Sequence, residues 1–82
     1  MKIIEIKVDE ALWSSSMLPE GIVAKWLVAD GGLAREGHGI AKVRIEGALH
    51  DVIAPRDGRL KIEVSVNDVI EPGSVLATLA PI

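Results

Sequence analysis

The chain repeats its own pattern at a fixed distance. Segment 30–43 reappears as segment 66–79, with Gly37 falling on Gly73. Apolar residues coincide at four further pairs of positions: Leu33 with Val69, Ile40 with Leu76, Ala41 with Ala77, and Val43 with Leu79. Gly21 and Gly58 open the two halves. Neither copy can bury an apolar face alone, so the repeat predicts two similar sheets packed on each other, the alternative being chance similarity of two glycine-punctuated strand pairs.

Apolar and polar residues alternate along most of the chain, which is the period of half-buried strands. Alternation or a short apolar run predicts strands over 4–8, 22–28, 41–45, 49–53, 60–66 and 75–79, the clearest being 60–66. In 22–28 the even positions should form one apolar face, with Trp26 pointing inward. Segment 9–19 is predicted as a loop with a short helical turn over 9–13. Helical periodicity is nowhere sustained, so the fold class is all-β.

Length and composition fit one small domain over residues 1–82. The chain holds only two aromatic residues, Trp13 and Trp26, and 49% of its residues are hydrophobic. The core must therefore be built from Val, Ile, Leu and Ala, a set that favours strands. An 82-residue chain buries roughly 60–65% of the surface that its unfolded form would expose, so it needs efficient packing or a partner.

Charge and cysteine content exclude several classes of function. The formal net charge is −3, with acidic and basic residues interspersed, so no footprint for nucleic acid or an anionic membrane is present. No apolar run is long enough to span a bilayer, and the N-terminal segment does not have the pattern of a signal peptide. The absence of cysteine rules out disulfides and thiolate metal sites and is compatible with the cytoplasm, which is the expected location.

Few residues invite a chemical assignment. His38 and His50 have no third metal ligand at a recognisable spacing, and Ser14-Ser15-Ser16 lacks the context of a nucleophile. We therefore expect no metal site, no catalytic residue and no enzyme activity of the domain itself. Trp13 has two open readings, a plug for one end of the fold or a docking surface.

The most informative motif is a predicted hairpin with Glu46-Gly47 at its turn. Residues along nearly the whole chain belong to the same pattern: Gly21, Trp26, Val28, Gly31, Gly37, Ile40, Val43, Glu46, Ala48, Ala54-Pro55, Gly58, Asn67-Asp68-Val69, Gly73 and Leu76. Together with the hairpin, this pattern resembles lipoyl and biotinyl carrier domains. The resemblance implies a flattened barrel-sandwich of two four-stranded antiparallel sheets with pseudo-twofold symmetry, and a modified lysine at a hairpin tip opposite the termini.

By this resemblance, Gly47 stands where the family carries its modified lysine. Its neighbours Glu46 and Ala48 are similar to the flanks of lipoyl domains in the acyltransferases of 2-oxo acid dehydrogenase complexes, not to the methionine flanks of biotinyl domains. Attachment of lipoate or biotin needs a primary amine as nucleophile, and glycine offers none. We therefore expect no cofactor and a non-carrier interaction or accessory module, whose partner is a protein, for example a component of an acyltransferase or dehydrogenase complex.

Two alternatives stay open. The first is a genuine lipoyl carrier, less readily a biotinyl one, whose lysine is replaced in this copy. The five lysines of the chain are predicted on strand faces, where a ligase that recognises the hairpin should ignore them: Lys2, Lys7, Lys25, Lys42 and Lys61. The second alternative is the barrel-sandwich segment of a membrane-fusion adaptor, although the long helical hairpin that usually interrupts such a segment is missing.

Overall fold

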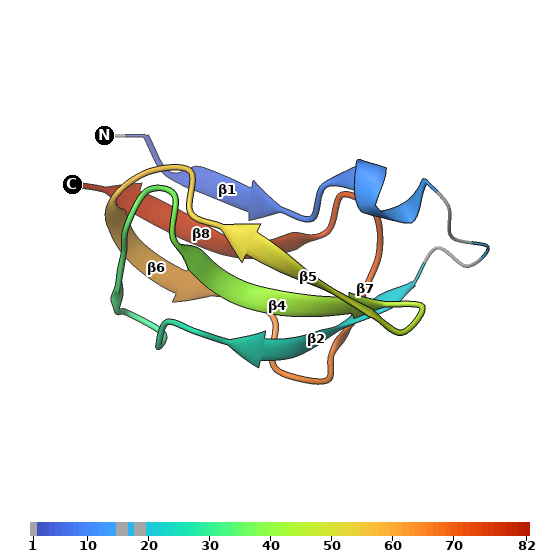
Figure 1. Ribbon diagram of the computed structural model, residues 1–82. Coiled ribbons are helices and arrows are strands. Elements are labelled where there is room, and N and C mark those ends of the chain that lie inside the picture. Colours follow the sequence, from blue (N-terminus) through green and yellow to red (C-terminus); the bar gives the residue numbers. More distant parts are fainter. Residues whose placement is uncertain (1, 15–16, 18–19) are drawn as a thin grey trace.

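The computed structural model describes residues 2–14, 17 and 20–82. They form two four-stranded antiparallel sheets, one in the order β1-β8-β6-β3 and the other in the order β5-β4-β2-β7 (Figure 1). The all-β prediction with two four-stranded sheets is therefore confirmed. The strands are β1 (Ile4–Lys7), β2 (Gly21–Trp26), β3 (Leu33–Ala34), β4 (Gly39–Ile45), β5 (Ala48–Ile53), β6 (Gly58–Ile62), β7 (Val69–Ile70) and β8 (Val75–Pro81).

The sequence repeat corresponds to a structural one. Strands β4 and β8 have the same succession of buried and exposed residues, and so do the short strands β3 and β7. The paired residues Ile40 and Leu76 are both fully buried, and Gly37 and Gly73 share a φ of 83°. Each half thus contributes equivalent strands to both sheets, which is how a repeat too small to fold alone obtains a core.

The core lies between the two sheets and is almost entirely aliphatic. Its largest fully buried side chains are those of Ile40, Leu60, Ile70, Leu76, Leu79, Val8, Val23 and Val43. No buried polar or charged residue occurs among the described residues. The composition rule that a chain with two aromatics must pack Val, Ile, Leu and Ala is therefore confirmed.

The prediction that Ile22, Ala24, Trp26 and Val28 of segment 22–28 form one apolar face is wrong in part. Trp26 and Val28 pack against the core as expected, but Ile22 lies opposite Arg44 on the outer side of its sheet. The pairing of β2 with β4 is irregular between Val23 and Lys25, and this β-bulge adds one residue to the strand. An extra residue reverses the alternation, so Ile22 and Trp26 cannot share a face.

The predicted strand 60–66 ends early, at Ile62. Beyond it the chain passes from one sheet to the other, and the carbonyl oxygen of Val64 accepts a hydrogen bond of 2.9 Å from Trp26 Nε1. Asp68 then closes a turn by accepting from the backbone N–H of Ser65 at 2.7 Å. The alternation of apolar residues continues beyond Ile62, through the crossing, which is why the sequence predicted a strand as far as residue 66.

The predicted helical turn is present as the 3₁₀ helix η1 (Glu10–Trp13). Asp9 caps it, since its carboxylate accepts a hydrogen bond of 2.9 Å from the backbone N–H of Ala11. Trp13 at the end of η1 is 7% exposed and belongs to the core, so of its two readings the plug is confirmed. Ser15, Ser16, Leu18 and Pro19 lie outside the described residues. No helix among the described residues is long and apolar enough to cross a membrane.

Candidate functional site

The β4–β5 hairpin turns at Glu46-Gly47, as predicted. Ile45 pairs with Ala48, which leaves a loop of two residues. Both loop residues have positive φ, 48° at Glu46 and 85° at Gly47. Two consecutive positive φ values define the type I′ turn, whose twist matches the twist of the flanking strands. Glycine at the second position therefore satisfies an ordinary requirement of a tight hairpin.

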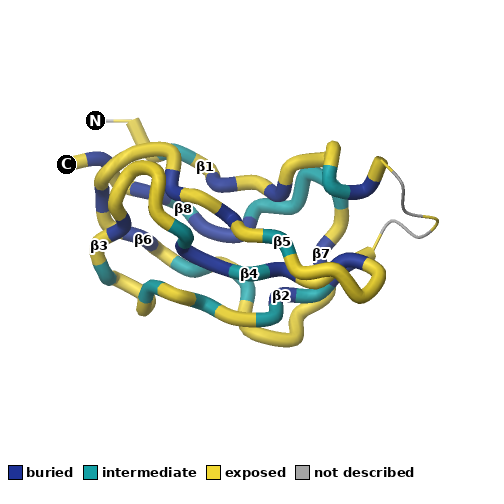
Figure 2. The backbone as a smooth tube through the Cα atoms, in the orientation of Figure 1, coloured by how far each residue is buried: buried dark blue, intermediate teal, exposed yellow. Residues whose placement is uncertain are grey.

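The hairpin tip is exposed and lies at the opposite end of the molecule from both termini (Figure 1). Glu46, Gly47 and Ala48 are all exposed (Figure 2). A Cβ atom built on Gly47 would meet no atom of the described residues within 4 Å, its two chain neighbours aside. Any side chain at this position would therefore extend into solvent without displacing a neighbour, as a swinging arm requires.

Glu46 ties the tip to the segment between η1 and β2. Its Oε1 atom accepts a hydrogen bond of 3.0 Å from the backbone N–H of Met17, a residue 29 positions earlier. The Met17 side chain is 92% exposed. The tip therefore lies beside an exposed methionine. No spacing or residue pattern in the sequence predicts this contact, because Met17 and Glu46 both lie outside strands and are far apart in the sequence.

The chemistry at the tip does not fit covalent attachment of a prosthetic group. Lipoyl and biotinyl groups are joined through an amide to a lysine amine, and Gly47 supplies no side chain. Lys7, Lys25, Lys42 and Lys61 lie within strands β1, β2, β4 and β6, and Lys2 precedes β1. Of the described lysines, none stands in the turn of a hairpin. The prediction that all five lie on strand faces is right for four and wrong for Lys2.

A shallow hollow of about 250 Å³ adjoins the tip. Its apolar part is formed by Ile22 and Val69 with the backbone of Gly21 and Gly47, and its polar rim by Arg44, Glu20 and Glu46. Val69 is 63% exposed. The hollow is open, and no buried polar group of the described residues points into it. It is therefore better suited to contact with an apolar side chain than to catalysis.

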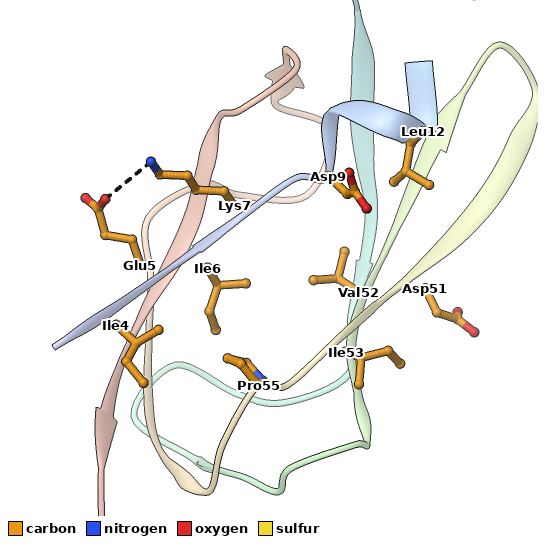
Figure 3. Close-up of a pocket in the computed structure, with 10 residues that line it drawn as sticks. All are labelled: Ile4, Glu5, Ile6, Lys7, Asp9, Leu12, Asp51, Val52, Ile53 and Pro55. Atoms are coloured by element: carbon orange, nitrogen blue, oxygen red, sulfur yellow. Dashed lines mark ion pairs between the residues drawn. The ribbon is translucent and has the colours of Figure 1, made fainter. Parts of the chain in front are cut away.

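A larger groove of about 390 Å³ runs between the edge strands β1 and β5 (Figure 3). Ile6 and Val52 close its floor as part of the core. Its carboxylates already have partners, since Asp9 caps η1, Asp51 pairs with Lys42 at 2.8 Å, and Glu5 lies 3.8 Å from Lys7. The groove is the seam between two sheets that do not pair at this side, and it contains no converging set of reactive groups.

The two histidines lie far apart in the fold. His38 is exposed in the turn before β4, and half-buried His50 lies on β5 beside a hollow lined by Ala11, Leu12 and Ser14 of the η1 region. Among the described residues no three His, Cys, Asp or Glu side chains come together as a metal site would require. Trp13 Nε1 is buried and has no hydrogen-bond partner among the described residues.

Comparison with known proteins agrees with this architecture. A family model for biotin and lipoyl attachment domains, described as "Biotin-requiring enzyme", matches residues 14–79, which include β2 to β7 and most of β8. A search of curated proteins found no match. The family model covers most of the chain, and the two pseudo-symmetric sheets with an exposed hairpin opposite the termini are the architecture expected of this family. The chain therefore belongs to the biotin/lipoyl attachment family.

Proposed function

We propose that this chain is a lipoyl-domain-like module that carries no prosthetic group and acts as a cytoplasmic interaction or accessory module of a multienzyme complex. The observation that carries the proposal is Gly47 in the exposed hairpin turn, the position that we equate with the family's modified lysine. A ligase needs an amine to attack the activated acyl group, and glycine has none. The module itself supplies no catalytic group to its partners, which we expect among acyltransferase or dehydrogenase components.

The geometry of the turn supports the proposal. Glycine is favoured in a left-handed turn with open space around it, so the residue at the tip is explained by the turn without any role in attachment. Lys7, Lys25, Lys42 and Lys61 lie within strands and do not project from a turn. A carrier whose lysine is replaced in this copy is the competing function, because the family as a whole consists of carriers.

Intact-mass measurement tests the proposal directly. The chain is co-expressed with a lipoate ligase and, separately, with a biotin ligase, and its mass should equal that of the unmodified polypeptide. Gly47→Lys serves as the positive control and should gain a lipoyl mass, because its amine then projects freely from the tip. A lipoyl or biotinyl mass on the unaltered chain would disprove the non-carrier function.

The control also tests the assignment of the tip. A Gly47→Lys protein that folds normally but is refused by both ligases would contradict the equivalence of Gly47 with the family's lysine position. Urea denaturation of the variant establishes that it is folded before this conclusion is drawn.

A further inference from the structure

The outer side of the β5-β4-β2-β7 sheet carries a mixed apolar and cationic surface that the hairpin tip does not explain. We call it the outer face, and it consists of three rows across the strands. The row nearest the tip is Val69, Ile22, Arg44 and Leu49, the middle row is Lys25, Lys42 and Asp51, and the far row is Leu27, Gly39 and Ile53.

The outer face has an excess of positive charge on a chain whose net charge is −3. Lys25 lies directly opposite Lys42, a like-charged cross-strand pair that disfavours the sheet. Arg44 forms no ion pair with any described residue, and Asp51 is the one carboxylate on the face. In the middle row Lys42 is already paired with Asp51 at 2.8 Å, so Lys25 is the cation of that row that can accept a negative charge from another molecule.

Exposed apolar side chains border these cations on both sides. Among the described residues, four of the nine large exposed apolar side chains belong to the outer face: Leu27, Leu49, Ile53 and Val69. The hollow of about 250 Å³ lies at the tip end, between Ile22 and Val69. At the far end the side chain of Leu27 lies over Gly39, since its Cδ1 atom would be only 3.3 Å from an added Cβ. The tip end therefore offers a hollow to an apolar group, and the far end offers the exposed side chains of Leu27 and Ile53.

The spacing of the rows indicates the form of the occupant. Along β5 the rows follow one another at two residues, about 7 Å apart, whereas the bulges in β2 and β4 insert one more residue between two of the rows. Alternate residues of an extended chain have the same spacing of about 7 Å. An extended segment running along the strands would thus place an apolar, an acidic and a second apolar side chain over the three rows. Its acid belongs over the middle row, because Glu20 and Glu46 at the rim of the hollow would repel it.

Two other occupants fit less well. A second copy of this chain stacked face to face would bring cationic rows together. Single-stranded nucleic acid would need aromatic platforms, whereas the outer face has no aromatic side chain and only three cations. The face measures on the order of 300 Å², well below the roughly 800 Å² per partner of a stable complex, and so suits a short segment bound transiently.

We infer that the outer face binds an extended acidic segment of a partner protein, with an acidic residue flanked at alternate positions by two apolar residues. This inference rests on the proposed function, since a tip without a prosthetic group leaves the row of residues nearest to it accessible to a partner. The inference adds to the proposed function which surface binds the partner and what chemistry the partner's segment has.

Amide chemical shifts of the ¹⁵N-labelled protein test the inference. The probe is a capped synthetic peptide of sequence Gly-Leu-Ser-Glu-Ser-Leu-Gly at millimolar concentration. Shifts should move at Lys25, Lys42, Leu49 and Ile53 and saturate with a dissociation constant on the order of 1 mM, as expected for so small a contact. Two control peptides, one with Lys in place of Glu and one with the order Leu-Leu-Glu-Ser-Ser, should bind at least about threefold more weakly.

Matched variants separate this face from general electrostatics. Lys42→Glu should weaken the peptide about three- to tenfold, whereas Lys61→Glu on β6 of the other sheet makes the same charge change and should have no comparable effect. Asp51→Asn removes the acid from the face and should tighten binding about twofold. A single-stranded oligonucleotide is titrated in parallel and should leave these amides unmoved.

The outcomes are distinct from those of the mass measurement. Equal binding of the acidic and the lysine peptide, equal loss in both charge-reversal variants, stronger binding of the oligonucleotide, or no shift on the outer face would each overturn the inference. An unmodified mass with no shift rejects the docking surface alone. A lipoyl mass on the unaltered chain rejects the non-carrier function, whatever the peptide does.

Discussion

Replacing Gly47 by alanine isolates the cost of the turn from the chemistry of a lysine. A residue with a Cβ in the left-handed region is disfavoured by about 1–2 kcal/mol. No atom lies within 4 Å of the added Cβ, so no steric term is added to this conformational one. Alanine also restricts the unfolded chain, which offsets about 0.4–1 kcal/mol. We expect a net destabilisation of about 1 kcal/mol and a melting temperature lower by about 4–8 °C.

Urea denaturation measures this change as a shift in midpoint at constant slope, which shows that stability has changed and not the compactness of either state. Gly73→Ala is the matched control, because Gly73 has a φ of 83° and equally open surroundings. The two variants should lose the same stability. Gly47→Lys should resemble Gly47→Ala, whereas Gly47→Asn should lose less, since asparagine tolerates the left-handed region.

A Gly47→Ala protein as stable as the unaltered chain, or more stable, would refute the reasoning, because the tip would then not need a left-handed residue. A Gly47→Lys protein much less stable than Gly47→Ala would refute the claim that side chains at the tip meet only solvent. With folding free energies of about 5–15 kcal/mol typical of domains, a loss of about 1 kcal/mol leaves the lysine variant folded.

Three further predictions test contacts within the fold. Gly58→Ala places a Cβ against the backbone carbonyl of Ala80 and should destabilise the fold by about 3 kcal/mol or more. Circular dichroism should then show a strongly lowered melting temperature or no cooperative transition, and an unchanged melting temperature would contradict the close approach. Trp26→Phe loses the hydrogen bond to Val64 and should be more destabilising by about 1–2 kcal/mol than Trp13→Phe, which removes a donor without a partner; equal urea midpoints would contradict this. Asp51→Asn breaks an exposed ion pair and should shift the free energy of unfolding by less than about 1 kcal/mol; a larger shift in urea denaturation would show that the pair is structural.

The sequence predicted the features that depend on local pattern. The pattern of apolar and polar residues gave the strands β4 and β5, and the two-residue turn between them followed from a glycine between two strand signals. The repeat predicted paired sheets because each half carries the same residues at the same distances. These properties depend on neighbours in the chain, which is why they can be read without a structure.

The errors arise where the chain responds to contacts that are distant in sequence. The bulge that turns Ile22 outward depends on how β2 pairs with β4, about twenty residues later. β6 ends at Ile62, where the chain crosses to the other sheet and the carbonyl oxygen of Val64 accepts a hydrogen bond from Trp26, 38 positions earlier. The outer face was missed for the same reason, since the sequence showed the cations of β4 but not that Leu49, Ile53 and Val69 lie beside them.

The tip brings two requirements into conflict. A type I′ hairpin asks for positive φ at the second loop position, which favours glycine, whereas ligation asks for a residue with a long amine-bearing side chain. A lysine at position 47 must either accept the left-handed strain or turn the hairpin differently. The core is insensitive to the choice, because Gly47 contacts none of it. In the non-carrier module proposed above, ligation would not be required, and the conformational preference of the turn alone would favour glycine. The residue at the tip would then reflect whether the domain must be ligated, and not how its core is packed.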